Sequence, residues 1–292
     1  MLTLVMSSAP PPYPPPPPSS QPPPDDLPRR EPFQDYFTPQ PAPTPPRQGS
    51  STSNRGLLGG LAAGMAVLFK FGAFKTLLTL LLSFGLYWRF IGVWGAAGLV
   101  LMILVHEMGH VVEIRRQGMQ ASAPLFIPFF GAAIFQRQHP TDALKQAQIG
   151  IAGPLAGTVG ATVAFVLYGT THSPYILWWA YIGFLINLFN LIPVGMLDGG
   201  WIMAVVSKWF QVVGLVAIAA AVVLFHINPI VLFVVLLGLP AVTERFRNDK
   251  LPYYQSVPVP ARLAMGAAWL LLVGYLGFAF LQTQDLLQAV IR

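Results

Sequence analysis

From Leu57 onward, the chain is a succession of apolar runs separated by short charged stretches. One run, residues 92–105, carries no charged residue over its whole length. Over the full chain 54% of residues are hydrophobic and 10% are charged, whereas soluble domains have roughly 25% charged residues. A helix of about twenty apolar residues crosses the hydrocarbon core of a bilayer. The pattern therefore predicts an all-α polytopic membrane protein.

The hydropathy divides this region into one interfacial or re-entrant helix and a series of spans that give about six to seven transmembrane helices. The interfacial helix is expected at 56–73, a membrane core at 74–206 and C-terminal transmembrane helices at 207–292. The individual spans are placed at 74–91, 92–114, 147–169, 175–206, 211–225, 229–242 and 262–282. The segments 211–225 and 229–242 are short, and a hairpin that crosses only in part is the alternative for them.

The first 55 residues differ in kind from the rest, because they hold 18 of the 29 prolines. Such a composition predicts a disordered, proline-rich tail, which we place in the cytosol. The opening residues 1–6 are too short for the core of a signal peptide and lack a basic lead, so we expect no cleaved leader. The tail could bind a protein partner that recognises proline motifs, but we favour a role as a solvated tether.

Charge and cysteine content narrow the class of protein. The net charge is +6, but the basic residues lie between apolar spans, which favours membrane topology over nucleic-acid binding. If every span crosses, all of the 17 lysines and arginines except Arg89 and Arg292 lie on the cytosolic side, as the positive-inside rule requires. This predicts an integral, multi-pass protein, of the cytoplasmic membrane if bacterial, with a cytosolic N-terminus. With no cysteine, any transition metal must be held by nitrogen and oxygen.

The sequence His-Glu-Met-Gly-His at residues 106–110 stands inside an apolar span. Two histidines four residues apart lie on one face of a helix, where both reach a single zinc ion. Glu107 then stands beside the metal as a general base. Ionisable groups are costly at membrane depth, which indicates function. Glu113 lies at the cytosolic end of the span and is expected to be an ordinary interfacial glutamate.

A second acidic motif, residues 187–200, lies inside the span 175–206 and contains Asp198. Pro193 removes a backbone donor and the neighbouring glycines loosen the helix, so the span is expected to break there. Both Asp198 and His106 then lie toward the cytosolic side. Asp198 supplies the third protein ligand that a catalytic zinc needs.

These motifs resemble those of the site-2 proteases, which are intramembrane zinc metallopeptidases. The resemblance covers roughly residues 75–206 and also includes Gly-Ile-Ala-Gly-Pro-Leu-Ala-Gly at 150–157, which by itself indicates close helix packing. It implies a three-helix catalytic core with one Zn2+ per chain, held by His106, His110 and Asp198, and Glu107 as the catalytic base. Asn190 would lie near the substrate carbonyl.

The same resemblance implies a substrate and a place for it to bind. The substrate would be a transmembrane protein, for instance a membrane-tethered regulator, cut in or near its membrane segment. Residues 118–135 are similar to the family's membrane-associated loop or β-hairpin, which receives unwound substrate. We find no inserted PDZ-like domain and no nucleotide-sensing domains, so regulation by such modules is not implied.

Alternatives remain at the level of residues and of function. Asn187 is a weaker candidate for the substrate or oxyanion site, and an interhelical hydrogen bond explains it equally well. His139, His172 and His226 are expected to be ordinary interfacial histidines. A divalent-metal transporter and an inactive scaffold that binds membrane helices are the competing functions, although the complete set of ligands and base argues against both.

Overall fold

The computed structural model describes residues 73–129, 131–136, 138–195, 197–224 and 230–291. The predicted proline-rich tail 1–55 lies outside the described residues, as does His226. The same holds for the interfacial helix predicted at 56–73, except for Ala73, where helix α2 begins.

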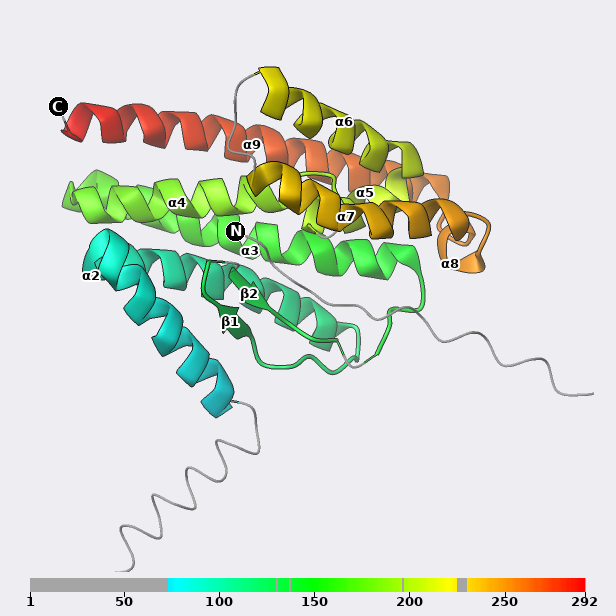
Figure 1. Cartoon of the computed structure of the whole chain (residues 1–292), viewed down its shortest axis with the longest axis horizontal. Helices are drawn as coiled ribbons and strands as arrows, with labels where there is room; N and C mark the ends of the chain where they lie inside the picture. Colours follow the sequence, from blue (N-terminus) through cyan, green and yellow to red (C-terminus); the bar gives the residue numbers. More distant parts are fainter. Residues whose placement is uncertain (1–72, 130, 137, 196, 225–229, 292) are drawn as a thin grey trace, which may run out of the picture. The chain divides into compact units, whose positions relative to one another are not determined.

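Helix α2 (Ala73–Arg116) is bent sharply at Gly92, whose backbone angles are φ 73° and ψ 167°. A positive φ of this size is cheap only for glycine, because a side chain would clash with the backbone. The boundary predicted between the spans 74–91 and 92–114 falls at this residue. Figure 1 shows the two halves of α2 running in different directions from the bend, the second of them along α3.

Helix α3 (Ala143–Thr171) is the centre of the bundle and packs against α2, α4 (Pro174–Asn190) and α5 (Asp198–Val206). It begins where the Asp142 carboxylate accepts a hydrogen bond from the Lys145 backbone N–H at 2.9 Å, a standard N-cap. The predicted interruption of the span 175–206 is confirmed, because α4 ends at Asn190 and α5 begins only at Asp198.

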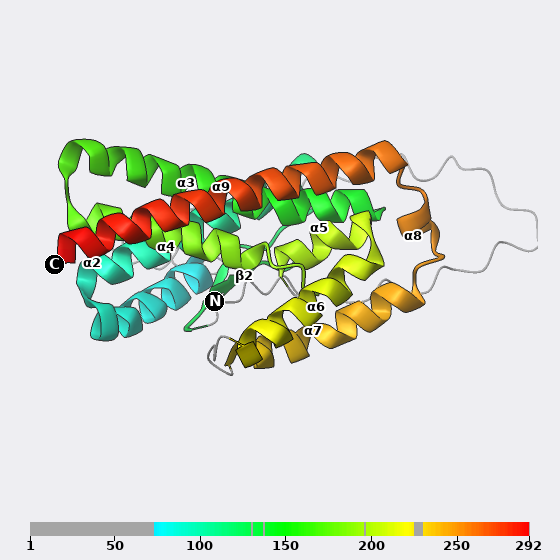
Figure 2. The same ribbon diagram turned by 90° about the horizontal axis from the view of Figure 1, so that it is seen from above.

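The C-terminal part consists of α6 (Lys208–Leu224), α7 (Ile230–Arg247), the short α8 (Pro252–Gln255) and α9 (Val259–Ile291). Helices α6 and α7 pack side by side, and α9 runs along α4 and α5 (Figure 2). Among the described helices, three are long and apolar enough to cross a membrane, namely Phe74–Arg116, Ala143–Thr171 and Val259–Val290. The protein is therefore an all-α membrane protein, and six to seven spans remain a prediction.

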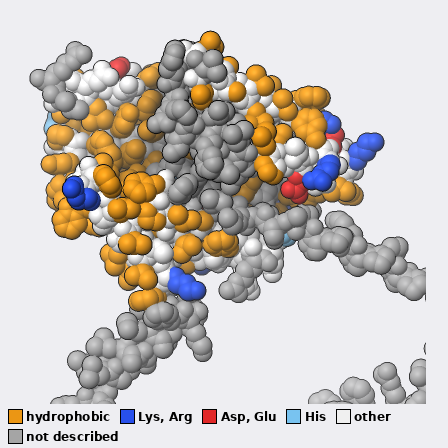
Figure 3. Space-filling view, viewed as in Figure 1, with side chains coloured by type: hydrophobic (Ala, Val, Ile, Leu, Met, Phe, Trp, Pro, Cys, Tyr) orange, Lys and Arg blue, Asp and Glu red, His pale blue; other side chains and the backbone are white. Residues whose placement is uncertain are grey.

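Figure 3 shows a face covered mainly by hydrophobic side chains, with a group of acidic and basic side chains at the end where α7 and α8 lie. Near this end Asp249 accepts hydrogen bonds from Lys208 Nζ at 2.7 Å and from Arg245 Nη1 at 2.8 Å. These bonds hold the pKa of the Asp249 carboxyl below its usual range. Arg245 Nε also donates to the carbonyl of Ala204 at 2.8 Å. The cluster thereby ties α6 and α7 to α5, the helix that begins with Asp198.

The segment expected to be a membrane-associated loop or hairpin forms an antiparallel hairpin of β1 (Leu125–Ile127) and β2 (Gly131–Ala133), paired Leu125 to Ala133 and Ile127 to Gly131. Hydroxyl groups of α2 occupy the outer edge of β1. Thr76 donates to the carbonyl of Pro124 at 2.6 Å, and Thr79 accepts from the N–H of Phe126 at 3.2 Å. Both threonines belong to the half of α2 that precedes Gly92, so hydrogen bonds attach the hairpin to that half.

The hairpin also rests on the other half of α2. Ile134, which follows β2, is fully buried in an apolar cluster with Val111, Ile114 and Ile149. Val111 and Ile114 lie beyond Gly92 on α2, close to the His-Glu-Met-Gly-His sequence. The hairpin is therefore fixed to both halves of the bent helix (Figure 1).

Candidate metal centre

His106 and His110 lie on one face of the second half of α2, as their spacing predicted. Their Nε2 atoms are 3.2 Å apart, and both side chains are almost completely buried. The helix sets this geometry, since residues four apart lie one above the other. Two imidazole nitrogens therefore point at one small volume inside the bundle.

Asp198 completes this group from the first position of α5. Its Oδ2 is 3.1 Å from His106 Nε2, and its Oδ1 is 3.4 Å from His110 Nε2. The ligand atoms of the three residues all lie within 4.8 Å of one another, and all three side chains are buried. The break after α4 makes this possible, because it lets a new helix begin with its first carboxylate facing α2.

The remaining ring nitrogens of both histidines are held by oxygen acceptors. His106 Nδ1 is 2.8 Å from Asn187 Oδ1, and His110 Nδ1 is 2.8 Å from the carbonyl oxygen of Ile149. Because an acceptor needs a donor, each Nδ1 carries a hydrogen, and in the neutral imidazole Nε2 then has the free lone pair. This is the tautomer in which a histidine binds a metal through Nε2.

The donor set fits zinc. Two imidazole nitrogens and one carboxylate oxygen are ligands that zinc prefers, and three protein ligands are the usual number in a catalytic site. Asp198 Oδ2 is buried and has no hydrogen-bond partner among the described residues. A buried carboxylate oxygen without a hydrogen-bond partner costs free energy of folding. A cation bound between His106, His110 and Asp198 would offset this cost.

The other predicted site residues are also buried. Glu107 is completely buried beside His106 on α2. Asn190, at the end of α4, is also completely buried, and its amide nitrogen donates to the carbonyl of Ile186 at 3.1 Å. Within the described part of the chain its Oδ1 has no hydrogen-bond partner. The structure thus brings His106, His110 and Asp198 into one group, with Asn187 hydrogen-bonded to it and Asn190 not.

Comparison with known families matches this chain to the model of peptidase family M50 over residues 94–173 and 169–236. These residues include every member of the candidate metal centre. The chain belongs to peptidase family M50. The site-2 protease resemblance of the sequence motifs is thereby confirmed.

Several proteins of other organisms are similar to part of the chain. The chain is 34% identical over 125 residues to "Putative zinc metalloprotease Rip3" of Mycobacterium tuberculosis. The aligned stretch covers 39% of this chain and 30% of that protein. It is 27% identical over 128 residues to "Zinc metalloprotease MJ0392" of Methanocaldococcus jannaschii, covering 42% of this chain and 37% of the relative. A rice protein, "Probable zinc metalloprotease EGY2, chloroplastic", is 29% identical over 157 residues, and the alignment covers 37% of this chain and 28% of the rice protein. The matched part spans about a third of each relative.

Two glycines of α3 make space for the M50 centre. A Cβ on Gly153 would lie 2.2 Å from His110 Nε2, and a Cβ on Gly157 would lie 2.1 Å from Asn187 Oδ1. The sequence predicted only close helix packing for residues 150–157. Such packing occurs at Ala152, where Gly109 of α2 lies so close that a Cβ on Gly109 would be 2.3 Å from the Ala152 carbonyl oxygen. The role of Gly153 and Gly157 was missed, although their four-residue spacing places both on one face of α3.

Replacing Gly153 by alanine is expected to weaken zinc binding by about 10–100-fold, the usual cost of disturbing the surroundings of a metal ligand. The added methyl group occupies the position of the His110 imidazole, which must turn away from the site. Titration with a competing chelator measures this change. Gly169→Ala on the same helix is the control, because nothing lies within 4 Å of its Cβ position. Equal zinc affinity of Gly153→Ala and Gly169→Ala would contradict the packing described.

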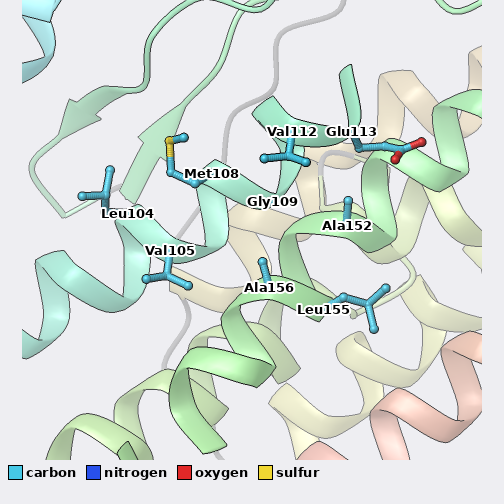
Figure 4. A pocket seen from close by; sticks show the side chains of 9 residues that line it. All are labelled: Leu104, Val105, Met108, Gly109, Val112, Glu113, Ala152, Leu155 and Ala156. Atoms are coloured by element: carbon cyan, nitrogen blue, oxygen red, sulfur yellow. The ribbon is translucent and has the colours of Figure 1, made fainter. Parts of the chain in front are cut away.

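A groove of about 550 Å³ lies on the outer face of the contact between α2 and α3. Figure 4 shows its lining, which includes Val105, Met108 and Val112 from α2 and Leu155 and Ala156 from α3. The lining is almost wholly apolar, and none of the three candidate ligands belongs to it. In this M50 protein the groove is therefore part of the apolar outer surface and does not include the metal centre.

Proposed function

We propose that the protein is an intramembrane zinc metalloprotease that hydrolyses peptide bonds in or near transmembrane segments of membrane proteins. The observation that carries this proposal is the buried group of His106, His110 and Asp198 with Glu107 beside it. Membership of peptidase family M50 supports the same reaction. Buried ionisable groups at membrane depth are expensive and are retained for function.

The residues of the site take distinct roles in this proposal. His106, His110 and Asp198 would hold one zinc ion, and zinc in such a site supplies Lewis acidity that activates water and polarises a carbonyl. Glu107 accepts a proton from the attacking water and then donates it to the leaving amine. Asn190 has an amide next to the break between α4 and α5 and is our candidate for contact with the substrate.

A transmembrane helix hides its carbonyl groups in hydrogen bonds, so the substrate must unwind before it is cut. We infer that the unwound segment pairs with the hairpin in an extended conformation. It would pair with β2, because Thr76 and Thr79 occupy the outer edge of β1. The substrate class is a membrane protein with an accessible transmembrane segment, such as a membrane-tethered regulator.

The positive-inside distribution of lysine and arginine supports an orientation with the N-terminus in the cytosol. Arg115 and Arg116 end α2 about one and a half turns after His110. The site therefore lies toward the cytosolic side in this proposal. The predicted spans 74–91 and 92–114 place the bend at Gly92 and the end of α2 at Arg116 on opposite sides of the membrane. Membrane-impermeant labelling of single cysteines introduced next to these two positions tests the orientation directly.

The proposed reaction is tested with the full chain purified in detergent and incubated with a panel of single-span membrane peptides. Mass spectrometry of the products is expected to show internal cleavage that a zinc chelator abolishes and added zinc restores. The transporter alternative is tested by measuring zinc uptake into liposomes that contain the same protein. Zinc transport across the liposome membrane, without cleavage of any peptide, would replace the protease by a transporter.

A further inference from the structure

We propose that Asn187 is a positioning residue that holds His106 in the orientation and tautomer needed to bind the metal. This inference rests on the proposed zinc centre and adds a residue to it. The Asn187 side chain is completely buried, and its Oδ1 lies 2.8 Å from His106 Nδ1. The sequence left two interpretations of Asn187, a weak substrate or oxyanion role and an interhelical hydrogen bond, and its contact with His106 on α2 is of the second kind.

The orientation of the Asn187 amide is determined by its second hydrogen bond. Its Nδ2 donates to the carbonyl of Gly183, one turn earlier on α4, at 2.7 Å. Because the nitrogen must face this acceptor, the oxygen must face His106. The imidazole therefore donates from Nδ1 and points Nε2 at Asp198 and His110. A chain of two hydrogen bonds thus runs from the backbone of α4 to a ligand on α2.

Helix α3 prevents the amide from turning away. A Cβ on Gly157 would lie 2.1 Å from Asn187 Oδ1 and 2.4 Å from Nδ2, so the amide occupies the space that any other residue at 157 would fill. The backbone of α3 therefore covers one side of the amide. Three helices meet at Asn187: α4 provides the side chain, α2 provides the histidine and α3 provides the wall.

The two histidines are held differently, which makes Asn187 open to test by substitution. The carbonyl of Ile149 holds His110, and no side-chain change removes it. The amide of Asn187 holds His106 and can be replaced. Outer hydrogen bonds of this kind fix the ring of a metal-binding histidine, and their loss typically costs about 10–100-fold in metal affinity. Asn190 is three residues further along α4 and shares no hydrogen bond with either histidine within the described residues.

The experiment compares Asn187→Leu, which has a similar size but no acceptor, with Asn187→Asp, which keeps an oxygen facing His106. Zinc affinity is measured by chelator competition on the full purified chain. The visible absorption of Co2+ bound in place of zinc reports the ligand geometry. We expect Asn187→Leu to bind zinc about 10–100-fold more weakly and to change the Co2+ spectrum. Asn187→Asp is expected to retain both properties, because it restores the acceptor.

A second pair of variants tests the same residue without replacing it. Gly157→Ala is expected to push the amide off His106 and reproduce the loss seen in Asn187→Leu, whereas Gly169→Ala leaves affinity unchanged. This pair keeps the inference testable if Asn187→Leu fails to fold. Wild-type affinity and an unchanged Co2+ spectrum in both Asn187→Leu and Gly157→Ala would overturn the positioning role and leave the zinc centre standing. If the wild-type chain binds no zinc, the proposed function and this inference both fail.

Discussion

Replacing Glu107 by glutamine is expected to abolish peptide cleavage and to leave zinc binding intact. Glutamine keeps the size of the side chain but cannot accept the proton of the attacking water. A positioned general base typically contributes about 10²–10⁴-fold to a rate, so cleavage should fall below detection for a slow membrane protease. His106, His110 and Asp198 are unchanged, so zinc content measured by mass spectrometry should remain that of the wild-type chain.

The matched control for Glu107→Gln is Glu113→Gln on the same helix. Glu113 accepts hydrogen bonds from Arg116 at 2.6 Å and 2.8 Å at the end of α2, and it belongs to no part of the metal centre. The same chemical change there should leave cleavage at the wild-type rate. In cells, the membrane-protein fragments that appear with the wild-type chain should be missing with Glu107→Gln. Fragments at wild-type levels with Glu107→Gln would remove Glu107 from the reaction.

Replacing His110 or Asp198 by alanine is expected to remove zinc and activity together. Each change takes away one of three protein ligands and leaves the other two buried groups without their common partner. The loss of zinc affinity should exceed the ~10–100-fold cost of losing an outer hydrogen bond. Equilibrium dialysis followed by zinc analysis gives the stoichiometry, and circular dichroism checks that the helices remain.

His172→Asn serves as the control for the ligand variants. His172 lies just after α3 in a left-handed conformation with φ 51°, which asparagine tolerates. Zinc stoichiometry should not change with this variant. Zinc retained at one equivalent in both His110→Ala and Asp198→Ala would disprove the ligand assignment, because the described residues offer no other group of this kind.

The sequence predicted those features that depend on local pattern. The spacing of His106 and His110 sets their common helical face, and Pro193 with its neighbouring glycines indicated the break that allows Asp198 to begin a new helix. Apolar run length predicted the existence of α3 and α9, but both helices extend beyond the predicted spans 147–169 and 262–282, and α9 continues to Ile291. In each case the physical cause acts along one continuous stretch of chain, so a single sequence contains enough information.

The contacts between helices could not be predicted in the same way. Nothing local indicates that Asn187 meets His106, a residue 81 positions away, or that the carbonyl of Ile149 holds His110. The use of Gly153 and Gly157 as space for side chains depends on the relative rotation of α3 against α2 and α4. Such rotations are decided by packing over the whole bundle, and a glycine pattern alone is compatible with several of them.

The bend at Gly92 has a mechanical consequence. The hairpin is joined by hydrogen bonds to the half of α2 before Gly92 and by apolar packing of Ile134 to the half after it. It works as a brace across the angle, because changing the angle would break one set of contacts or the other. A peptide strand supported by this brace keeps a fixed offset from His106 and His110. In the proposed protease, the distance between the hairpin and the two histidines along α2 would therefore set the position of the cut in a substrate paired with β2.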